Sequence, residues 1–160
     1  MAHPNEQLIE KFYSAFQKKD SKTMNECYAD TIEFSDPAFK SLKGNSAKAM
    51  WSMLCERAVN FSLSYSNIKA DDNSGSADWI ATYDFSKTGR KIENHIQAEF
   101  KFKDGKIISH KDSFNLWKWA GMALGIKGYL LGFLPSVQNK ISQEAMTGLT
   151  MYMKRNRIKE

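Results

Sequence analysis

The sequence predicts an α+β domain, in which N-terminal helices cover one face of a curved antiparallel sheet and a helical extension follows. Two observations predict this class. Apolar residues up to Ala58 recur with the spacing of amphipathic helices, whereas from Phe61 onward they alternate with polar residues, as in half-buried strands. Short turn sequences separate the alternating runs, so consecutive strands must be antiparallel.

The helical part begins near the N-terminus. Pro4 suits the first turn of a helix, and Phe12 and Phe16 lie four residues apart on an apolar stripe. This spacing predicts an amphipathic helix that ends near Lys19. Asp20 is a good cap for a second, short helix that follows directly.

A short strand, a third helix and a series of long strands complete the predicted domain. Thr31–Ser35 is rich in strand-forming residues, and Pro37 ends the strand because it has no backbone N–H. A helix is expected from Gly44 to Ala58. The later strands are predicted from the alternation of apolar residues within 61–68, 79–85, 92–102 and 108–116.

The C-terminal part is Gly-rich and then helical. We expect residues 1–117 to form the α+β domain and residues 118–160 to form an extension that packs on it, giving a single domain overall. The segment 117–135 is apolar, but Lys118 and Lys127 argue against a membrane span, because each costs roughly 2–3 kcal/mol near the bilayer centre. A lid or a dimer contact over the mouth of the sheet is favoured, with an interfacial membrane contact as the alternative.

Composition excludes several classes of function. The net charge of +5 is modest and concentrated at the C-terminus, so we expect no nucleic-acid partner and do not favour membrane contact. Cys27 and Cys55 are not spaced like metal ligands, and we expect them to be buried free thiols. We therefore expect neither a metal nor an organic cofactor. The N-terminus does not resemble a signal peptide, which favours a cytoplasmic location.

Three titratable residues are candidates for chemistry. His110 and Asp112 are two apart on the last strand and share a face with Ile108 and Phe114, where polar groups need partners, water or a ligand. Asp36 ends the first strand and is either a turn residue or a general base that faces a cavity. Either this face is exposed to solvent at that end, or His110 and Asp112 are bonded to each other for structural reasons, or they are the acid–base pair of a pocket.

Apolar residues on the same inward face would line that pocket. Tyr83 is either a packed core residue or a hydrogen-bond donor to a ligand, and His95 belongs to the opposite face. The expected lining consists of Phe34, Tyr83, Phe85, Asn94, Ile96, Ala98, Phe100 and Phe114.

The order of several motifs resembles the nuclear-transport-factor-two-like superfamily, a cone-shaped α+β fold shared by ketosteroid isomerases, SnoaL-like polyketide cyclases and limonene-epoxide hydrolases. The resemblance covers roughly residues 5 to 117. The motifs that carry it are Phe12–Phe16 with Asp20, Tyr28–Asp30 leading to Ser35–Pro37, Gly89–Lys91 leading to Phe100–Phe102, and Gly105–Ile108.

This resemblance implies roles for particular residues. Asp36 matches the proton-shuttle aspartate of the isomerases, and Asp112 matches a catalytic aspartate of the hydrolases and cyclases. The two isomerase hydrogen-bond donors align with Phe12 and Ala98, which cannot donate, while Tyr13 is one residue away and is expected to point elsewhere. Steroid isomerisation by that mechanism is therefore not expected.

Two functions follow from these observations. The first is binding of a small apolar molecule with acid–base catalysis of isomerase, cyclase or hydrolase type by Asp112 and His110, with Asp36 as a second carboxylate. The second is a non-catalytic module that binds a ligand or another protein. The resemblance also implies a homodimer.

Overall fold

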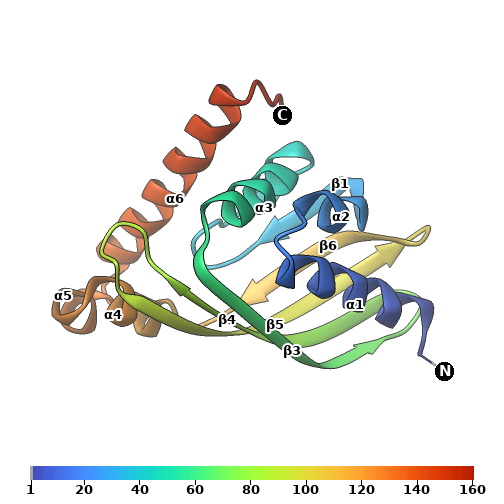
Figure 1. Ribbon diagram of the computed structural model, residues 1–160, viewed down its shortest axis with the longest axis horizontal. Coiled ribbons are helices and arrows are strands. Elements are labelled where there is room, and N and C mark those ends of the chain that lie inside the picture. Colours follow the sequence, from blue (N-terminus) through green and yellow to red (C-terminus); the bar gives the residue numbers. More distant parts are fainter. Residues whose placement is uncertain (1) are drawn as a thin grey trace.

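The structure, a computed structural model that describes residues 2–160, confirms the α+β class (Figure 1). Helices α1, α2 and α3 and a curved six-stranded sheet form the body, and three further helices follow. The helices of the body are α1 (Pro4–Gln17), α2 (Ser21–Glu26) and α3 (Asn45–Arg57). The strands are β1 (Tyr28–Ser35), β2 (Leu42–Lys43), β3 (Val59–Ala70), β4 (Ser74–Asp84), β5 (Lys91–Lys103) and β6 (Lys106–Ser113).

The sheet has the strand order β2-β1-β6-β5-β4-β3. Strands β3 to β6 form the predicted antiparallel series, but β1 pairs with β6 in parallel, which the sequence did not indicate. No short turn joins β1 to β6, so no local signal could specify this pair. Its register sets Phe34 opposite His110 and Ser35 opposite Lys111. The ends of β1 and β6 therefore lie together.

The first helices cover the concave face of the sheet, where the core lies (Figure 1). The apolar stripe of α1 is buried through Ile9, Phe12 and Phe16, and Trp51 of α3 packs against Phe16. Asp20 caps α2 as predicted, accepting a hydrogen bond from the Thr23 backbone N–H. Large apolar side chains thus fill the interior of the cone, and such burial is the main stabilising term in folding.

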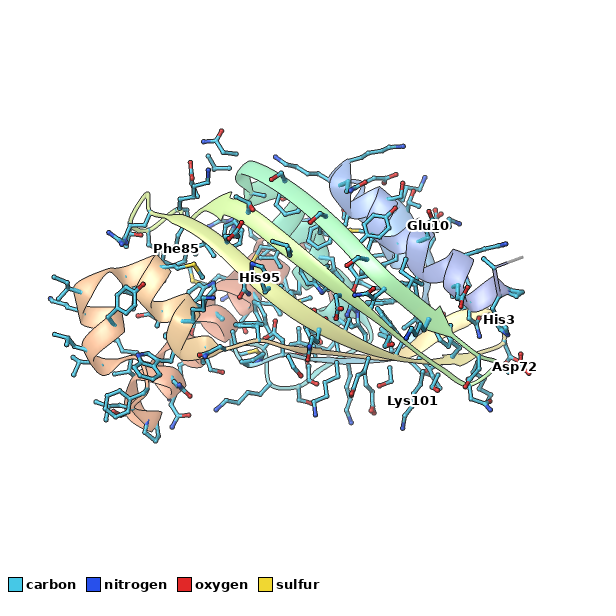
Figure 2. All side chains as sticks on the ribbon, turned by 90° about the horizontal axis from the view of Figure 1, so that it is seen from below. His3, Glu10, Asp72, Phe85, His95 and Lys101 are labelled. Carbon is cyan, nitrogen blue, oxygen red and sulfur yellow. The ribbon has the colours of Figure 1, made fainter. Side chains whose placement is uncertain are left out.

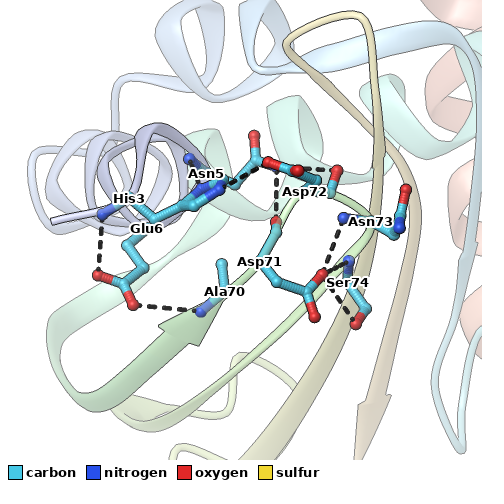
Figure 3. Close-up of polar contacts among 8 residues, drawn as sticks. All are labelled: His3, Asn5, Glu6, Ala70, Asp71, Asp72, Asn73 and Ser74. Carbon is cyan, nitrogen blue, oxygen red and sulfur yellow. Dashed lines mark hydrogen bonds and ion pairs between the residues drawn. The ribbon is translucent and has the colours of Figure 1, made fainter.

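The N-terminus of α1 is tied to the turn between β3 and β4 (Figure 3). The imidazole of His3 caps the helix, and the side-chain amide of Asn5 donates to the Asp71 carbonyl oxygen over 2.9 Å. Glu6 accepts a hydrogen bond from the backbone N–H of Ala70. These contacts fix the N-terminal end of α1 to the β3–β4 turn.

The last strand corrects two sequence expectations. A bulge shifts the register between β5 and β6, so that Ile107 pairs with Phe102 and Ser109 with Lys101. Ile107 takes the core position, and Ile108 is the extra residue of the bulge rather than a neighbour of His110 on the inward face. Leu116 does not extend the strand, because β6 ends at Ser113 and Leu116 begins a helix.

The extension folds into α4 (Leu116–Leu124), α5 (Ile126–Leu131) and α6 (Pro135–Arg155). Helix α6 contains the predicted C-terminal helix and runs past α3 (Figure 1), where the Tyr152 hydroxyl donates to Glu56. The antiparallel pair α4–α5 lies beside the turn between β4 and β5. Among residues 2–160, none of the helices has the length and apolarity needed to cross a membrane. Cys27 and Cys55 are buried and free, as predicted.

Candidate functional site

The parallel β1–β6 pair brings the two candidate carboxyl groups to one place. Phe34 and His110 form an inward-facing pair across these strands. Side chains alternate between the two faces of a strand. Asp36 and Asp112, two residues after Phe34 and His110, are therefore the next residues expected on the inward face. Asp112 in turn pairs with Ala98 of β5. Two carboxyl groups therefore lie near each other where β1 and β6 end, and the charge of Asp112 acts on Asp36.

A chain of hydrogen bonds joins four buried side chains to Asp112. The indole N–H of Trp51 donates to the Tyr28 hydroxyl oxygen at 2.9 Å, and this hydroxyl lies 2.6 Å from Nδ1 of His110. Nε2 of His110 lies 2.8 Å from Oδ1 of Asp112, which also accepts from the Trp79 indole at 3.3 Å. Because an ionised Asp112 can only accept, Nε2 of His110 donates to it, and in a neutral imidazole Nδ1 then accepts from the Tyr28 hydroxyl.

Aromatic rings surround the imidazole of His110, which is 1% exposed. The ring centroid of Phe100 lies 4.4 Å away, and Phe34 meets the imidazole edge-on at 5.1 Å. Trp51 stacks on it at 6.0 Å. Polar groups in such surroundings need every hydrogen bond satisfied, and both imidazole nitrogens are satisfied here. The arrangement holds His110 in one orientation and aims it at Asp112.

Asp36 occupies a different environment. It is half-buried, and its Oδ1 accepts hydrogen bonds from the backbone N–H groups of Ala38 and Phe39 at 2.8 and 2.6 Å. Desolvation raises its pKa to about 7, and the negative charge of Asp112 adds to this rise, whereas the two backbone hydrogen bonds oppose it. Among residues 2–160 it forms no ion pair. Asp36 is therefore both a turn residue and a group that titrates near neutral pH.

Tyr13 is a polar residue of the core, contrary to the expectation that it points elsewhere on the helix. It does not point away from the interior: it is fully buried and its ring lies 5.8 Å from that of Trp79. Its hydroxyl has no hydrogen-bond partner among the described residues. Desolvation raises its pKa well above the usual value, and the charge of Asp112 contributes. A tyrosine on the apolar stripe of the first helix was the signal that could have identified it.

The expected lining residues divide into two groups. Those on the middle of the sheet are buried core residues, namely Phe34, Asn94, Ile96, Ala98 and Phe100. Tyr83, Phe85 and Phe114 are half-buried near the start of α4. The indole of Trp119 donates to the Tyr83 hydroxyl at 3.0 Å, and the ring of Trp119 meets Phe85 edge-on. Burial raises the pKa of Tyr83, and the nearby charge of Asp36 adds to this rise.

Hollows in the surface lie beside this cluster of carboxyl groups rather than within it. One of about 390 Å³ is bounded by Pro37, Phe114 and Trp117, next to Asp36 in the chain. Two others, of about 600 and 750 Å³, are lined mainly by charged and polar residues; the first lies at the start of β1 and the second beside the β3–β4 turn and the outer face of β5 and β6. None of these three is lined by Asp36, His110 or Asp112. In the described chain, no group of three His, Cys, Asp or Glu side chains is arranged to hold a metal ion.

Solved structures share this fold. An epoxide hydrolase of the limonene type from M. tuberculosis superposes with a TM-score of 0.64 at 17% identity, over 82% of this chain and 96% of its own. A ketosteroid isomerase-like protein from Catenulispora acidiphila, bound to trimethylamine, gives 0.64 at 8% identity over 72% and 91%. TerC, crystallised with polyporic acid, gives 0.61 at 13% identity over 71% and 92%.

The sequence comparisons identify the family. No curated protein matches the chain significantly in sequence. The family model of the SnoaL-like domain matches residues 9–110, which extend from α1 to His110 and make up more than half of the chain. The recognised segment includes Asp36, and the cone-like sheet and helices agree with the solved structures. The chain belongs to the SnoaL-like domain family.

Proposed function

We propose that the protein binds a small, mainly apolar molecule beside Asp36 and Asp112 and moves a proton on it through these carboxyl groups. One observation carries the proposal: Asp36 follows directly on the β1–β6 pair, half-buried and near enough to Asp112 for that charge to act on it, and desolvation raises the pKa of Asp36 to about 7. A general acid or base works best when its pKa lies near the working pH. A half-buried carboxyl group without a cation is costly for stability, which favours a functional reason for its presence.

Each neighbouring side chain would have a separate role in this proton transfer. Asp36 would take a proton from a ligand carbon next to a carbonyl group and return it at another position. Asp112, held through Oδ1 by His110 and Trp79, would present its other oxygen to the ligand. His110 is then a positioning residue. The unpartnered hydroxyl of Tyr13 would donate to the ligand oxygen, where negative charge develops.

The solved structures support a small ligand in this fold. TerC was crystallised with polyporic acid, and the protein from Catenulispora acidiphila was bound to trimethylamine. Both are small organic molecules. The hollow beside Pro37 offers an entrance next to Asp36.

The second candidate is binding without catalysis. It is favoured by the enclosure of His110, whose two nitrogens are already bonded to Tyr28 and Asp112. A histidine in this state holds its neighbours in place and has no free position for a substrate proton. The ligand would then contact only Asp36, Tyr83 and the hollow near Phe114.

Proton exchange into a bound ligand separates the two candidates. A panel of cyclic enones and aryl ketones is screened for binding by ligand-observed NMR, and each binder is then incubated with the protein in D2O. Catalysis predicts enzyme-dependent deuterium uptake at the carbon next to the carbonyl group, lost in Asp36→Asn and reduced about 100-fold or more in Asp112→Asn. Asp30→Asn, on the exposed side of β1, is the matched control and should exchange like wild type.

Each result has a definite meaning. Binding without deuterium uptake, unchanged by Asp112→Asn, replaces catalysis by the binding function. Absence of binding across the panel, in protein shown to be folded by circular dichroism, contradicts both candidates for this ligand class.

A further inference from the structure

The α4–α5 pair is packed with its small residues inside. Gly128 of α5 and Gly132, which caps its C-terminus, face α4, and a Cβ at Gly128 would lie 1.9 Å from the carbonyl oxygen of Ala120. A Cβ at Gly132 would lie 2.8 Å from that of Ala120. The two helices therefore touch through their backbones where Gly128 meets Ala120. The ring of Tyr129 lies over Gly121 of α4, whereas Ile126 and Leu130 are mostly exposed.

The outer surface of this pair is consequently apolar. Ile126 is 76% exposed, Leu130 67% and Tyr129 59%, although side chains of these types are normally buried. We call the following set the hairpin patch: Trp117, Leu124, Ile126, Tyr129, Leu130, Leu131 and Phe133, all at least a third exposed. Figure 2 shows this end of the molecule beyond Phe85, with side chains extending away from the sheet. Several large exposed apolar side chains on one pair of helices indicate a contact site.

The charged residues within the segment that carries the patch have one sign, and the nearby Glu144 is paired with Lys87. Between Ser113 and Gln143 the sequence contains no Asp or Glu, whereas Lys118 and Lys127 lie within the two helices and are exposed. Arg90, from the turn between β4 and β5, approaches Gly125 at the junction of the helices. Aromatic and aliphatic residues beside lysines, with no carboxylates, are typical of segments that lie in the interface of an anionic membrane.

We propose that the hairpin patch docks on an anionic lipid surface, with its apolar side chains in the interfacial layer and its lysines at the headgroups. The same lysines that oppose a membrane span favour this shallow position, because their ammonium groups stay in water beside lipid phosphates. The partner is a lipid surface rather than a second copy of the chain. A two-fold contact would set the patch against itself and bring lysines together with no carboxylate between them.

The pair is held firmly enough to present this surface. The indole N–H of Trp117 donates to the Tyr129 carbonyl oxygen at 2.9 Å, which joins α4 to α5. The Thr88 hydroxyl donates to the Ala123 carbonyl oxygen, and the Arg90 guanidinium donates to that of Met122 at 2.9 Å. These bonds anchor the pair to the body of the protein. Membrane contact through the patch would therefore set the orientation of the whole domain.

Vesicle co-sedimentation tests the proposal. Wild type is mixed at low salt with vesicles of phosphatidylcholine and phosphatidylglycerol in equal parts, and with vesicles of phosphatidylcholine alone. We expect binding to the anionic vesicles and a blue shift of tryptophan fluorescence that Trp117→Phe removes. Leu130→Ser with Phe133→Ser should weaken binding about tenfold or more. Lys118→Gln with Lys127→Gln should weaken it about tenfold or more as well, because each lysine contributes about fivefold near an anionic surface.

Two matched variants serve as controls. Lys101→Gln with Lys103→Gln removes the same charge from the outer face of the sheet, and Met151→Ser removes an exposed apolar residue of α6. Both should bind like wild type. Failure of wild type to bind anionic vesicles, or equal binding by the patch and control variants, overturns the proposal. A concentration-dependent dimer in sedimentation velocity that Leu130→Ser with Phe133→Ser dissociates also overturns it, and assigns the patch to self-association.

Discussion

The interior of the cone and the α4–α5 pair use large and small residues in opposite ways. In the cone, Phe12, Trp51 and Phe100 are turned inward and almost wholly buried. In the pair, glycines are turned inward and residues such as Ile126 and Leu130 are turned outward. The cone is thus stabilised by buried apolar surface, whereas the pair relies on close backbone contact and hydrogen bonds. Exposure of the hairpin patch is a result of how the pair is packed, and not of loose structure.

Among substitutions in the cone, we expect replacement of the hydrogen-bonded His110 to cause the largest loss of stability. His110→Ala removes the acceptor of the Tyr28 hydroxyl and a partner of Asp112, and it leaves a cavity among aromatic rings. We expect a loss of about 3–5 kcal/mol in the free energy of unfolding, measured by urea denaturation. His95→Ala, on the exposed face of the same sheet, should change it by less than about 0.5 kcal/mol. Similar effects of the two substitutions would contradict the structural role of the chain of hydrogen bonds.

The α4–α5 pair is broken most directly by one methyl group. Gly128→Ala places a Cβ against the Ala120 carbonyl oxygen, so the helices must separate. We expect destabilisation by about 1–3 kcal/mol, measured by thermal unfolding. Gly148→Ala is the control, because nothing lies within 4 Å of its Cβ position on α6. That change should stabilise by about 0.5–1 kcal/mol through helix propensity. A neutral Gly128→Ala would mean that the two helices are not in backbone contact.

A smaller effect is expected at Asp36 and depends on pH. Its folded-state pKa of about 7 lies above the ordinary aspartate value, so the folded protein keeps a proton that the unfolded chain loses between about pH 4 and pH 7. The stability of wild type should therefore fall as pH rises through this window. Asp36→Asn, whose side-chain oxygen can still accept the two backbone hydrogen bonds, should lack this fall. Above pH 7 it should exceed wild type by about 1–2 kcal/mol after allowance for partial exposure.

Urea titrations of both proteins at a series of pH values give this difference directly. Asp30→Asn should follow the wild-type curve, because its side chain is exposed. Parallel curves for wild type and Asp36→Asn would show that Asp36 titrates in its normal range, and would also remove the main support for its acid–base role.

Elements with strong periodicity could be predicted from the sequence, and elements specified by distant contacts could not. The stripe of Phe12 and Phe16 and the alternation within β3 to β5 gave helices and strands of the right type. The parallel β1–β6 pair and the two-residue β2 carry no local signal, because their partners are remote in sequence. Glycines such as Gly125 indicated that no continuous helix follows Trp117. They did not indicate that this region folds into a pair of helices.

The same limit applies to the candidate site. The inward direction of His110 and Asp112 follows from alternation, and the structure places both in the interior. The hydrogen bonds from Tyr28 and Trp51 could not be predicted, since aromatic residues on apolar stripes also serve as plain packing. Whether these groups bind a ligand remains a prediction, because spacing shows which residues share a face and not which molecule meets them.

The bulge at Ile108 has a consequence for sequence change in this family. It adds one residue between the tight turn at Asp104 and the level of His110, and so determines which of two alternating sets of β6 side chains faces inward. Without it, Ser109 and Lys111 would take the interior positions and Asp112 would face the solvent. A single-residue insertion or deletion in this hairpin would thus act like a frame shift in the sheet, preserving the strand while exchanging its two faces.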